Sequence, residues 1–105
     1  MPDYGPMYGM HVRFTAAPGR ADELEAILLQ AAEELRADEA CRLYMISRSP
    51  ADAETIWVTE AWTSRDAHAA SLEDPAARVL IDRALPLMAG PPEADELRPS
   101  GGKGL

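Results

Sequence analysis

The spacing of apolar side chains changes from every second residue to every third or fourth residue within the first 40 residues of the chain. Over Tyr8–Thr15 apolar residues alternate with polar residues and glycine, which predicts a strand with one face on a core. From Ala21 to about Asp38 they follow the spacing of an amphipathic helix. The inward positions are Tyr8, Met10, Val12 and Phe14 in the strand, and Leu24, Ile27, Leu28, Ala31 and Leu35 in the helix.

The middle of the chain is predicted to form two more strands. Leu43–Ser49 and Thr55–Trp62 are joined by a short polar turn whose length fits an antiparallel hairpin. Both faces of this hairpin carry large apolar side chains. We expect Tyr44, Ile46 and Trp57 to lie on the face of the sheet that no helix covers.

Two helices are predicted after the hairpin. Ser64 is placed to cap a helix over Arg65–Leu72, and Asp74 is placed to cap a second helix that begins at Pro75. Pro86 is expected to kink or end the second helix, because its ring clashes with the carbonyl four residues before it. The buried side of the second helix is expected to consist of Val79, Leu80, Ala84 and Met88.

The last strand is predicted at a sheet edge, over Glu93–Arg98, and residues 99–105 resemble a flexible tail. The resulting order is that of the ferredoxin-like split βαβ arrangement. The fold class is therefore α+β, with a four-stranded antiparallel sheet and helices on one face. The length suits a single domain over residues 1–105, with an ordered core at about residues 7–98. The uncovered face would expose apolar side chains, so we predict a homodimer in which two sheets close on each other.

Composition excludes several classes of partner. The net charge is −8 and the basic residues form no cluster, so neither nucleic acid nor an anionic membrane surface is an expected partner. No apolar run is long enough to cross a bilayer, and residues 1–6 lack the basic and apolar regions of a secretory signal. Cys41 is the only cysteine, which suits a reducing compartment. We expect a cytoplasmic protein.

Three segments together resemble a known family. A strand ending in Glu60–Trp62 leads through Ser64 into a helix, and Leu87–Glu93 supplies a glycine-proline segment before the last strand. Pro18–Arg20 precedes the amphipathic helix. Over about residues 7–98 this pattern resembles the antibiotic biosynthesis monooxygenase family.

The resemblance implies a dimeric α+β barrel. It also implies oxidation of a polycyclic phenol or quinol by molecular oxygen without metal or flavin, although relatives bind or degrade haem and many members have no assigned activity. Active members often carry one histidine on the helix after the tryptophan and another just after the proline. Those positions hold Ser71 and Ala76 here, and His68 lies one helical turn earlier.

Trp62 and His68 are the candidate catalytic residues. Trp62 would form the wall of a pocket and stack on a flat aromatic substrate. Filling the core is the other role open to Trp62, and the two roles are compatible. His68 would accept a proton, since histidine titrates near neutral pH. The plainer alternative for His68 is a partly exposed surface side chain.

Glu60, Tyr44 and His11 are further candidates for contact with a substrate. Glu60 should lie on a central strand, where a carboxylate must be hydrogen-bonded or paired, and Arg13 is a candidate partner. We interpret Glu60 first as structural and second as a pocket acid. Tyr44 would donate a hydrogen bond to a phenolate or lie at a dimer surface. His11 would line a pocket or interface, or lie on a solvated strand face.

The sequence lacks the motifs of cofactor-dependent chemistry. His11, His68 and Cys41 are far apart in the sequence and lack the spacing of metal ligands, so no metal is expected. We interpret Cys41 as a small packed side chain. Nor does a glycine-rich turn lie between a strand and a helix to hold a dinucleotide. The leading hypothesis is a cofactor-independent monooxygenase acting on an aromatic phenol or quinol. A non-catalytic dimeric module that binds a small ligand, or a pathway accessory protein, is the alternative. Haem binding is a third hypothesis.

Overall fold

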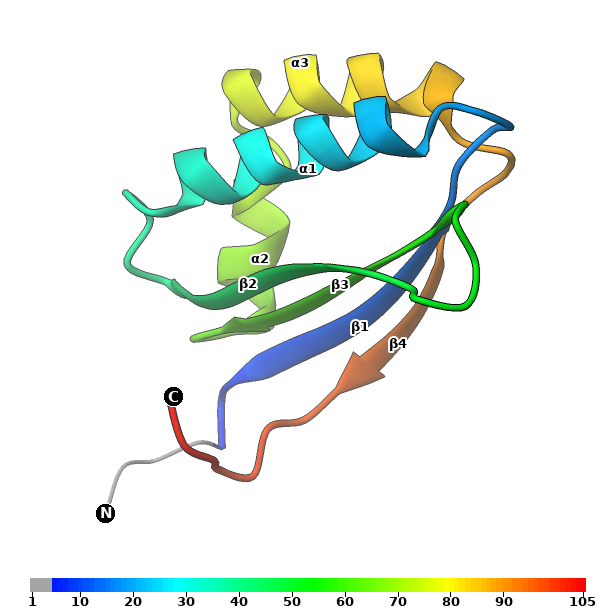
Figure 1. Ribbon diagram of the computed structural model, residues 1–105. Coiled ribbons are helices and arrows are strands. Elements are labelled where there is room, and N and C mark those ends of the chain that lie inside the picture. Colours follow the sequence, from blue (N-terminus) through cyan, green and yellow to red (C-terminus); the bar gives the residue numbers. More distant parts are fainter. Residues whose placement is uncertain (1–4) are drawn as a thin grey trace.

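A four-stranded antiparallel sheet carries the helices on one of its faces (Figure 1). The computed structural model describes residues 5–105. Residues 1–4, part of the segment that lacks the features of a secretory signal, lie outside the described residues. The elements are β1 (Tyr8–Thr15), α1 (Ala21–Leu35), β2 (Cys41–Arg48), β3 (Thr55–Trp62), α2 (Arg65–Ser71), α3 (Pro75–Ala84), the 3-10 turn η1 (Leu85–Leu87) and β4 (Glu93–Leu97). The sheet order β2-β3-β1-β4 confirms the predicted ferredoxin-like α+β arrangement.

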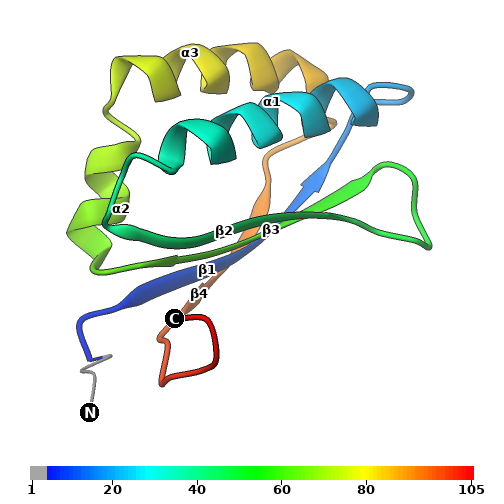
Figure 2. The same ribbon diagram turned by 60° about the vertical axis from the view of Figure 1, so that its left-hand side comes forward.

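Capping side chains mark the start of α2 and α3, and a proline marks the end of α3. Ser64 caps α2 by accepting a hydrogen bond from the amide of Ala67 over 3.0 Å, and Asp74 caps α3 through the amide of Ala76 over 2.8 Å. Helix α3 gives way to a 3-10 turn that contains Pro86, as predicted. Figure 2 shows α1 and α3 side by side above the sheet and α2 at one end of it. Within residues 5–105 no helix is long and apolar enough to span a bilayer.

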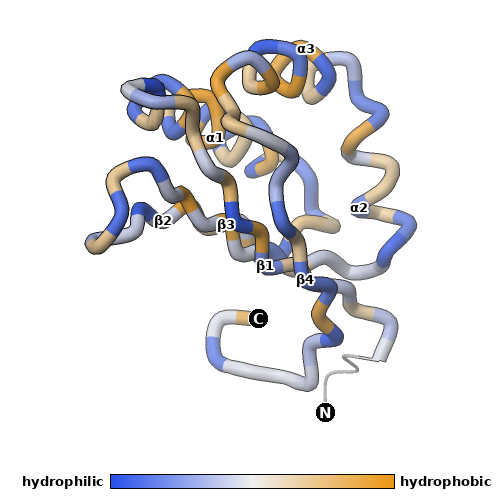
Figure 3. Tube along the Cα trace, turned by 90° about the vertical axis from the view of Figure 1, so that its right-hand side faces the viewer, coloured by the Kyte–Doolittle hydropathy of each residue, from blue (hydrophilic) through white to orange (hydrophobic). Residues whose placement is uncertain are grey.

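The core lies between the sheet and the helices α1 and α3. Its largest fully buried side chains are Trp62, Leu24, Ile56 and Val58. Cross-strand partners such as Val12 and Val58 share a face of the sheet, so the alternation in each strand sorts its side chains between core and surface. Hydrophobic and hydrophilic positions interleave along both long helices (Figure 3), as expected of helices that bury one side.

Two predicted orientations in β2 are wrong. Tyr44 pairs with Glu60 and Ile46 pairs with Val58, and both side chains pack against the core under the helices. The uncovered face instead carries Leu43 and Met45 from this strand, and it also carries Trp57, as predicted. Both sides of β2 are apolar, so the alternation of its residues fits either orientation equally well.

One predicted core position in α3 is also wrong. Val79 is 57% exposed, whereas Leu80 and Ala84 are buried as expected. The helix therefore presents a narrower stripe to the core than the sequence pattern indicates.

Candidate functional site

A cavity of about 870 Å³ lies between the sheet and the helices, near the C-terminal end of α1. This volume lies within the range of sites that hold small molecules. The walls come from α1, the loop after it, β2, β3, α2 and α3. Its polar lining includes Tyr44, Glu60, Trp62, His68 and Ser71, and its apolar lining includes Ala31, Leu35, Leu72, Leu80 and Ile81.

Glu60 and Trp62 form the floor of this cavity on β3. They are two residues apart on one strand, so both side chains lie on the face that the helices cover. The indole N–H of Trp62 donates a hydrogen bond to Oε1 of Glu60 over 2.9 Å. Glu60 is 9% exposed and Trp62 is 1% exposed. A buried carboxylate needs a hydrogen-bond donor, and Trp62 on the same strand provides one for Glu60.

Burial raises the pKa of the Glu60 carboxyl above its ordinary value. The hydrogen bond from Trp62 and the nearby His68 act in the opposite direction and are the smaller influences. The carboxyl group is therefore one that takes up a proton more readily than an exposed glutamate.

His68 of α2 lies close to Glu60. Its Nε2 lies 3.6 Å from Oε1 of Glu60, and its side chain is 15% exposed. The imidazole also meets the indole of Trp62 edge-on, with ring centroids 5.4 Å apart. The structure thus brings together both predicted catalytic residues and the predicted pocket acid.

Tyr8 is a neighbour of this group that sequence reasoning did not single out. Its ring centroid lies 5.3 Å from that of His68. The guanidinium of Arg65 lies over the Tyr8 ring at 4.8 Å and pairs with Glu96 of β4. The sequence pattern of β1 places Tyr8 on the inward face of the sheet. It does not place Tyr8 beside the site, because that position follows from the pairing of Tyr8 with Trp62.

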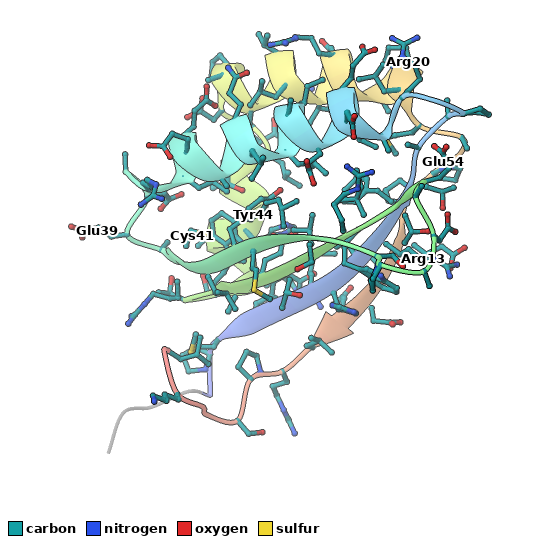
Figure 4. The ribbon with its side chains drawn as sticks, viewed as in Figure 1. Arg13, Arg20, Glu39, Cys41, Tyr44 and Glu54 are labelled. Atoms are coloured by element: carbon teal, nitrogen blue, oxygen red, sulfur yellow. The ribbon has the colours of Figure 1, made fainter. Side chains whose placement is uncertain are left out.

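Tyr44 lies next to Glu60 on the neighbouring strand and lines the same cavity. Figure 4 shows its side chain between the sheet and the helices. Burial, with the charge of Glu60 as a second cause, raises the pKa of Tyr44 above its ordinary value. The phenol therefore keeps its proton at neutral pH and can donate a hydrogen bond into the cavity.

His11 lies on the other face of the sheet, away from this cavity. Its ring stacks on Trp57 with centroids 4.6 Å apart, and its Nδ1 lies 3.3 Å from the hydroxyl of Thr59. The candidate pairing of Arg13 with Glu60 is wrong: Arg13 points to the uncovered face and forms an ion pair with Glu93. Residues 11 and 13 share that face because successive strand residues alternate.

Cys41 does not provide a reactive thiolate. Burial raises the pKa of the thiol to about 11, with the charges of Glu60 and Asp38 adding to the effect. At neutral pH the side chain is a protonated thiol. Within residues 5–105, moreover, no three His, Cys, Asp or Glu side chains are grouped so as to hold a metal ion.

Known proteins share both the sequence pattern and the fold. The family model described as antibiotic biosynthesis monooxygenase matches residues 7–83. A candidate antibiotic biosynthesis monooxygenase from Chloroflexus aurantiacus J-10-fl is 38% identical, with a TM-score of 0.83 over 91% of this chain and 95% of that one. No curated protein sequence matches significantly.

Two more distant structures share the fold alone. One is a candidate antibiotic biosynthesis monooxygenase from Caulobacter crescentus CB15, which is 24% identical with a TM-score of 0.85 over 93% of each chain. The other is SnoaB, a cofactor-independent oxygenase from Streptomyces nogalater, which is 15% identical with a TM-score of 0.79 over 93% of this chain and 97% of that one.

Proposed function

The chain belongs to the antibiotic biosynthesis monooxygenase family, and on this basis we propose that it oxidises an aromatic phenol or quinol with molecular oxygen, without metal or flavin. The observation that carries the proposal is the contact of Glu60, Trp62 and His68 along one cavity. A cavity of about 870 Å³ accommodates a fused aromatic ring system.

Binding uses the apolar walls of the cavity. A flat ring system buries its faces against the exposed side chains of Leu72 and Ile81, while Trp62, which is 1% exposed, closes the floor. The protonated phenol of Tyr44 donates a hydrogen bond to a substrate oxygen. Contact with these walls holds the ring in one orientation and displaces water from its faces.

His68 acts as the base that removes the phenolic proton of the substrate. The imidazole takes the phenolic proton, and the cation that forms lies within 3.6 Å of the Glu60 carboxylate, which stabilises it. Trp62 keeps that carboxylate in place through its hydrogen bond. The resulting phenolate is electron-rich enough to react with oxygen directly.

The substrate supplies all four electrons that reduce the oxygen molecule. For a phenol with a hydrogen on the ring carbon opposite the hydroxyl, one oxygen atom forms a bond to that carbon and becomes the second carbonyl of a quinone. The other oxygen atom leaves as water with the hydroxyl proton and the ring hydrogen. Phenol and oxygen thus give quinone and water, and His68 returns its proton to the departing oxygen.

A binding module without turnover is the second candidate function. Ser71 and Ala76 line the cavity at the positions where the sequence departs from the histidines of active members. Such a module would hold the same class of ligand in the same cavity. A ligand that stays chemically unchanged in air would support it.

The uncovered sheet face supports a further proposal, that two copies of the chain pair through it. Leu43, Met45 and Leu97 are exposed large apolar side chains of the sheet strands, and Leu43 and Met45 lie on this face beside Trp57. Closing two such faces removes this surface from water.

Oxygen consumption tests the proposed reaction. Chelator-treated protein is given a panel of polycyclic phenols and hydroquinones in an oxygen electrode, with heat-denatured protein as the control. Uptake that depends on native protein and yields a quinone supports the monooxygenase. Tight binding of a panel member with no uptake favours the binding module instead.

A further inference from the structure

Four exposed or half-buried carboxylates, which we call the rim carboxylates, line the outer part of the cavity. Glu34 near the end of α1, Asp38 and Glu39 in the loop after it, and Asp74 before α3 all line the cavity. Figure 4 shows Glu39 at the outer end of that loop. Glu60 lies deeper, on β3. Of the described residues that line the cavity, none is a lysine or an arginine.

The backbone adds to this negative potential. The C-terminal end of a helix carries a partial negative charge, and basic side chains usually occupy its last turn. In α1 the last turn holds no basic residue, while Glu34 and Asp38 lie at that end. Within residues 5–105 no ion pair engages Glu34, Asp38, Glu39 or Asp74. Arg36, the residue that follows α1, pairs with Glu33 instead.

The proposed oxidation makes this potential chemically significant. Deprotonating a phenol places a negative charge on the ligand, and the surrounding carboxylates oppose that charge. A ligand that carries its own positive charge near the rim carboxylates relieves this repulsion and pairs with them. A ligand with a carboxylate substituent does the reverse.

We propose that the cavity selects an aromatic ligand bearing an ammonium or similar cationic substituent, with its rings against Leu72 and Ile81 and its cation toward Asp38 and Asp74. The proposal rests on the proposed function, because it takes the cavity to be the binding site. It identifies the substrate class by charge, and it makes the rim carboxylates specificity-determining residues.

Matched ligands that differ only in the charged group test the proposal. Calorimetric titration compares (aminomethyl)naphthalene, (hydroxymethyl)naphthalene and naphthoate at low and high salt. We expect the amine to bind about tenfold or more tightly than the carboxylate at low salt, with the alcohol between them, since several carboxylates act together at short range. In 1 M salt, where the screening length is about 3 Å, the ratio should shrink severalfold.

Two double variants separate the rim from the overall charge. Asp38→Asn with Asp74→Asn removes two rim charges, and asparagine still accepts the backbone hydrogen bonds that both aspartates accept. Glu23→Gln with Asp95→Asn removes two charges elsewhere, at the start of α1 and on β4. The rim variant should lose most of the preference for the amine, and the control should keep it.

The outcomes distinguish this inference from the proposed function. Equal affinities for amine and carboxylate, or an equal loss of preference in both double variants, would overturn the charge selection and leave the proposed function standing. Failure of all three naphthalenes to bind would overturn both, because the cavity would then not be a site for aromatic ligands.

Discussion

Trp62 donates its indole N–H to the carboxylate of Glu60, two residues earlier on the same strand, over 2.9 Å. The largest fully buried side chain is thereby bonded to a buried acid. The bond joins two roles, because the same indole fills the core and fixes the carboxylate that faces His68. Core packing and site geometry are consequently coupled in β3.

Trp62→Phe should destabilise the protein more than the same change at Trp57. The variant removes the hydrogen-bond donor from a buried carboxylate and leaves a small void, which together cost about 1–3 kcal/mol. Trp57→Phe is the matched control on the uncovered face, where a phenylalanine can still stack on His11. Urea unfolding of both variants measures the difference. Equal losses would show that the bond to Glu60 contributes nothing to stability.

Glu60→Gln should change how stability depends on pH. Burial raises the pKa of Glu60 in the folded protein above that of the unfolded chain, so the folded state holds the proton more tightly. The contribution of Glu60 to stability therefore falls as pH rises from about 4 through the folded pKa, and then levels off. Glutamine does not titrate, so the free energy of unfolding of the variant minus that of the wild type should rise over this range. A difference that stays constant with pH would contradict the raised pKa.

The sequence was most informative where one face of an element is apolar and the other is polar. Tyr8–Thr15 shows this contrast, and its predicted bounds and faces agree with β1. Residues 41–48 lack it, and β2 also contains an irregularity in register between Cys41 and Leu43. Only the pairing with β3 fixes which side of β2 meets the core, which is why the sequence pattern predicts the wrong face for Tyr44.

Contacts between residues far apart in the sequence likewise limit how much of the site can be predicted. Glu60 and Trp62 are adjacent on one face of a strand, so the alternation alone places them together. The positions of His68 and Tyr8 depend on how α2 docks and how β1 pairs with β3. Opposite charge makes Arg13 a candidate partner of Glu60, whereas the alternation of β1 directs Arg13 to Glu93 on the other face.

Ser64→Ala should loosen the helix that carries His68. Helix α2 has seven residues and buries none of them fully, so it depends strongly on its cap. Removing the Ser64 hydroxyl frees the Ala67 amide and should cost about 0.5–2 kcal/mol. Hydrogen exchange at that amide should become faster, and Ser64→Thr should restore the protection. Unchanged exchange in Ser64→Ala would show that the cap does not hold α2.

Met45→Glu should give a monomer if two copies pair through the uncovered face. The substitution places a charge among apolar side chains that the pairing would bury. Met45 is 49% exposed in the single chain, and Leu29 on α1 is 52% exposed. Leu29→Glu is therefore a matched control and should remain dimeric in light scattering at micromolar concentration. A wild-type monomer would refute the pairing.

The most direct test of the site compares oxygen uptake by His68→Ala and His11→Ala with that of the wild type. The measurement uses chelator-treated protein and a phenol that the wild type oxidises. His68 lies on the cavity beside Glu60, whereas His11 lies on the opposite face of the sheet. We expect His68→Ala to lose about 10²–10⁴-fold in rate, the usual contribution of a general base, and His11→Ala to retain wild-type uptake. Full activity in His68→Ala would contradict the assignment of His68 as the base.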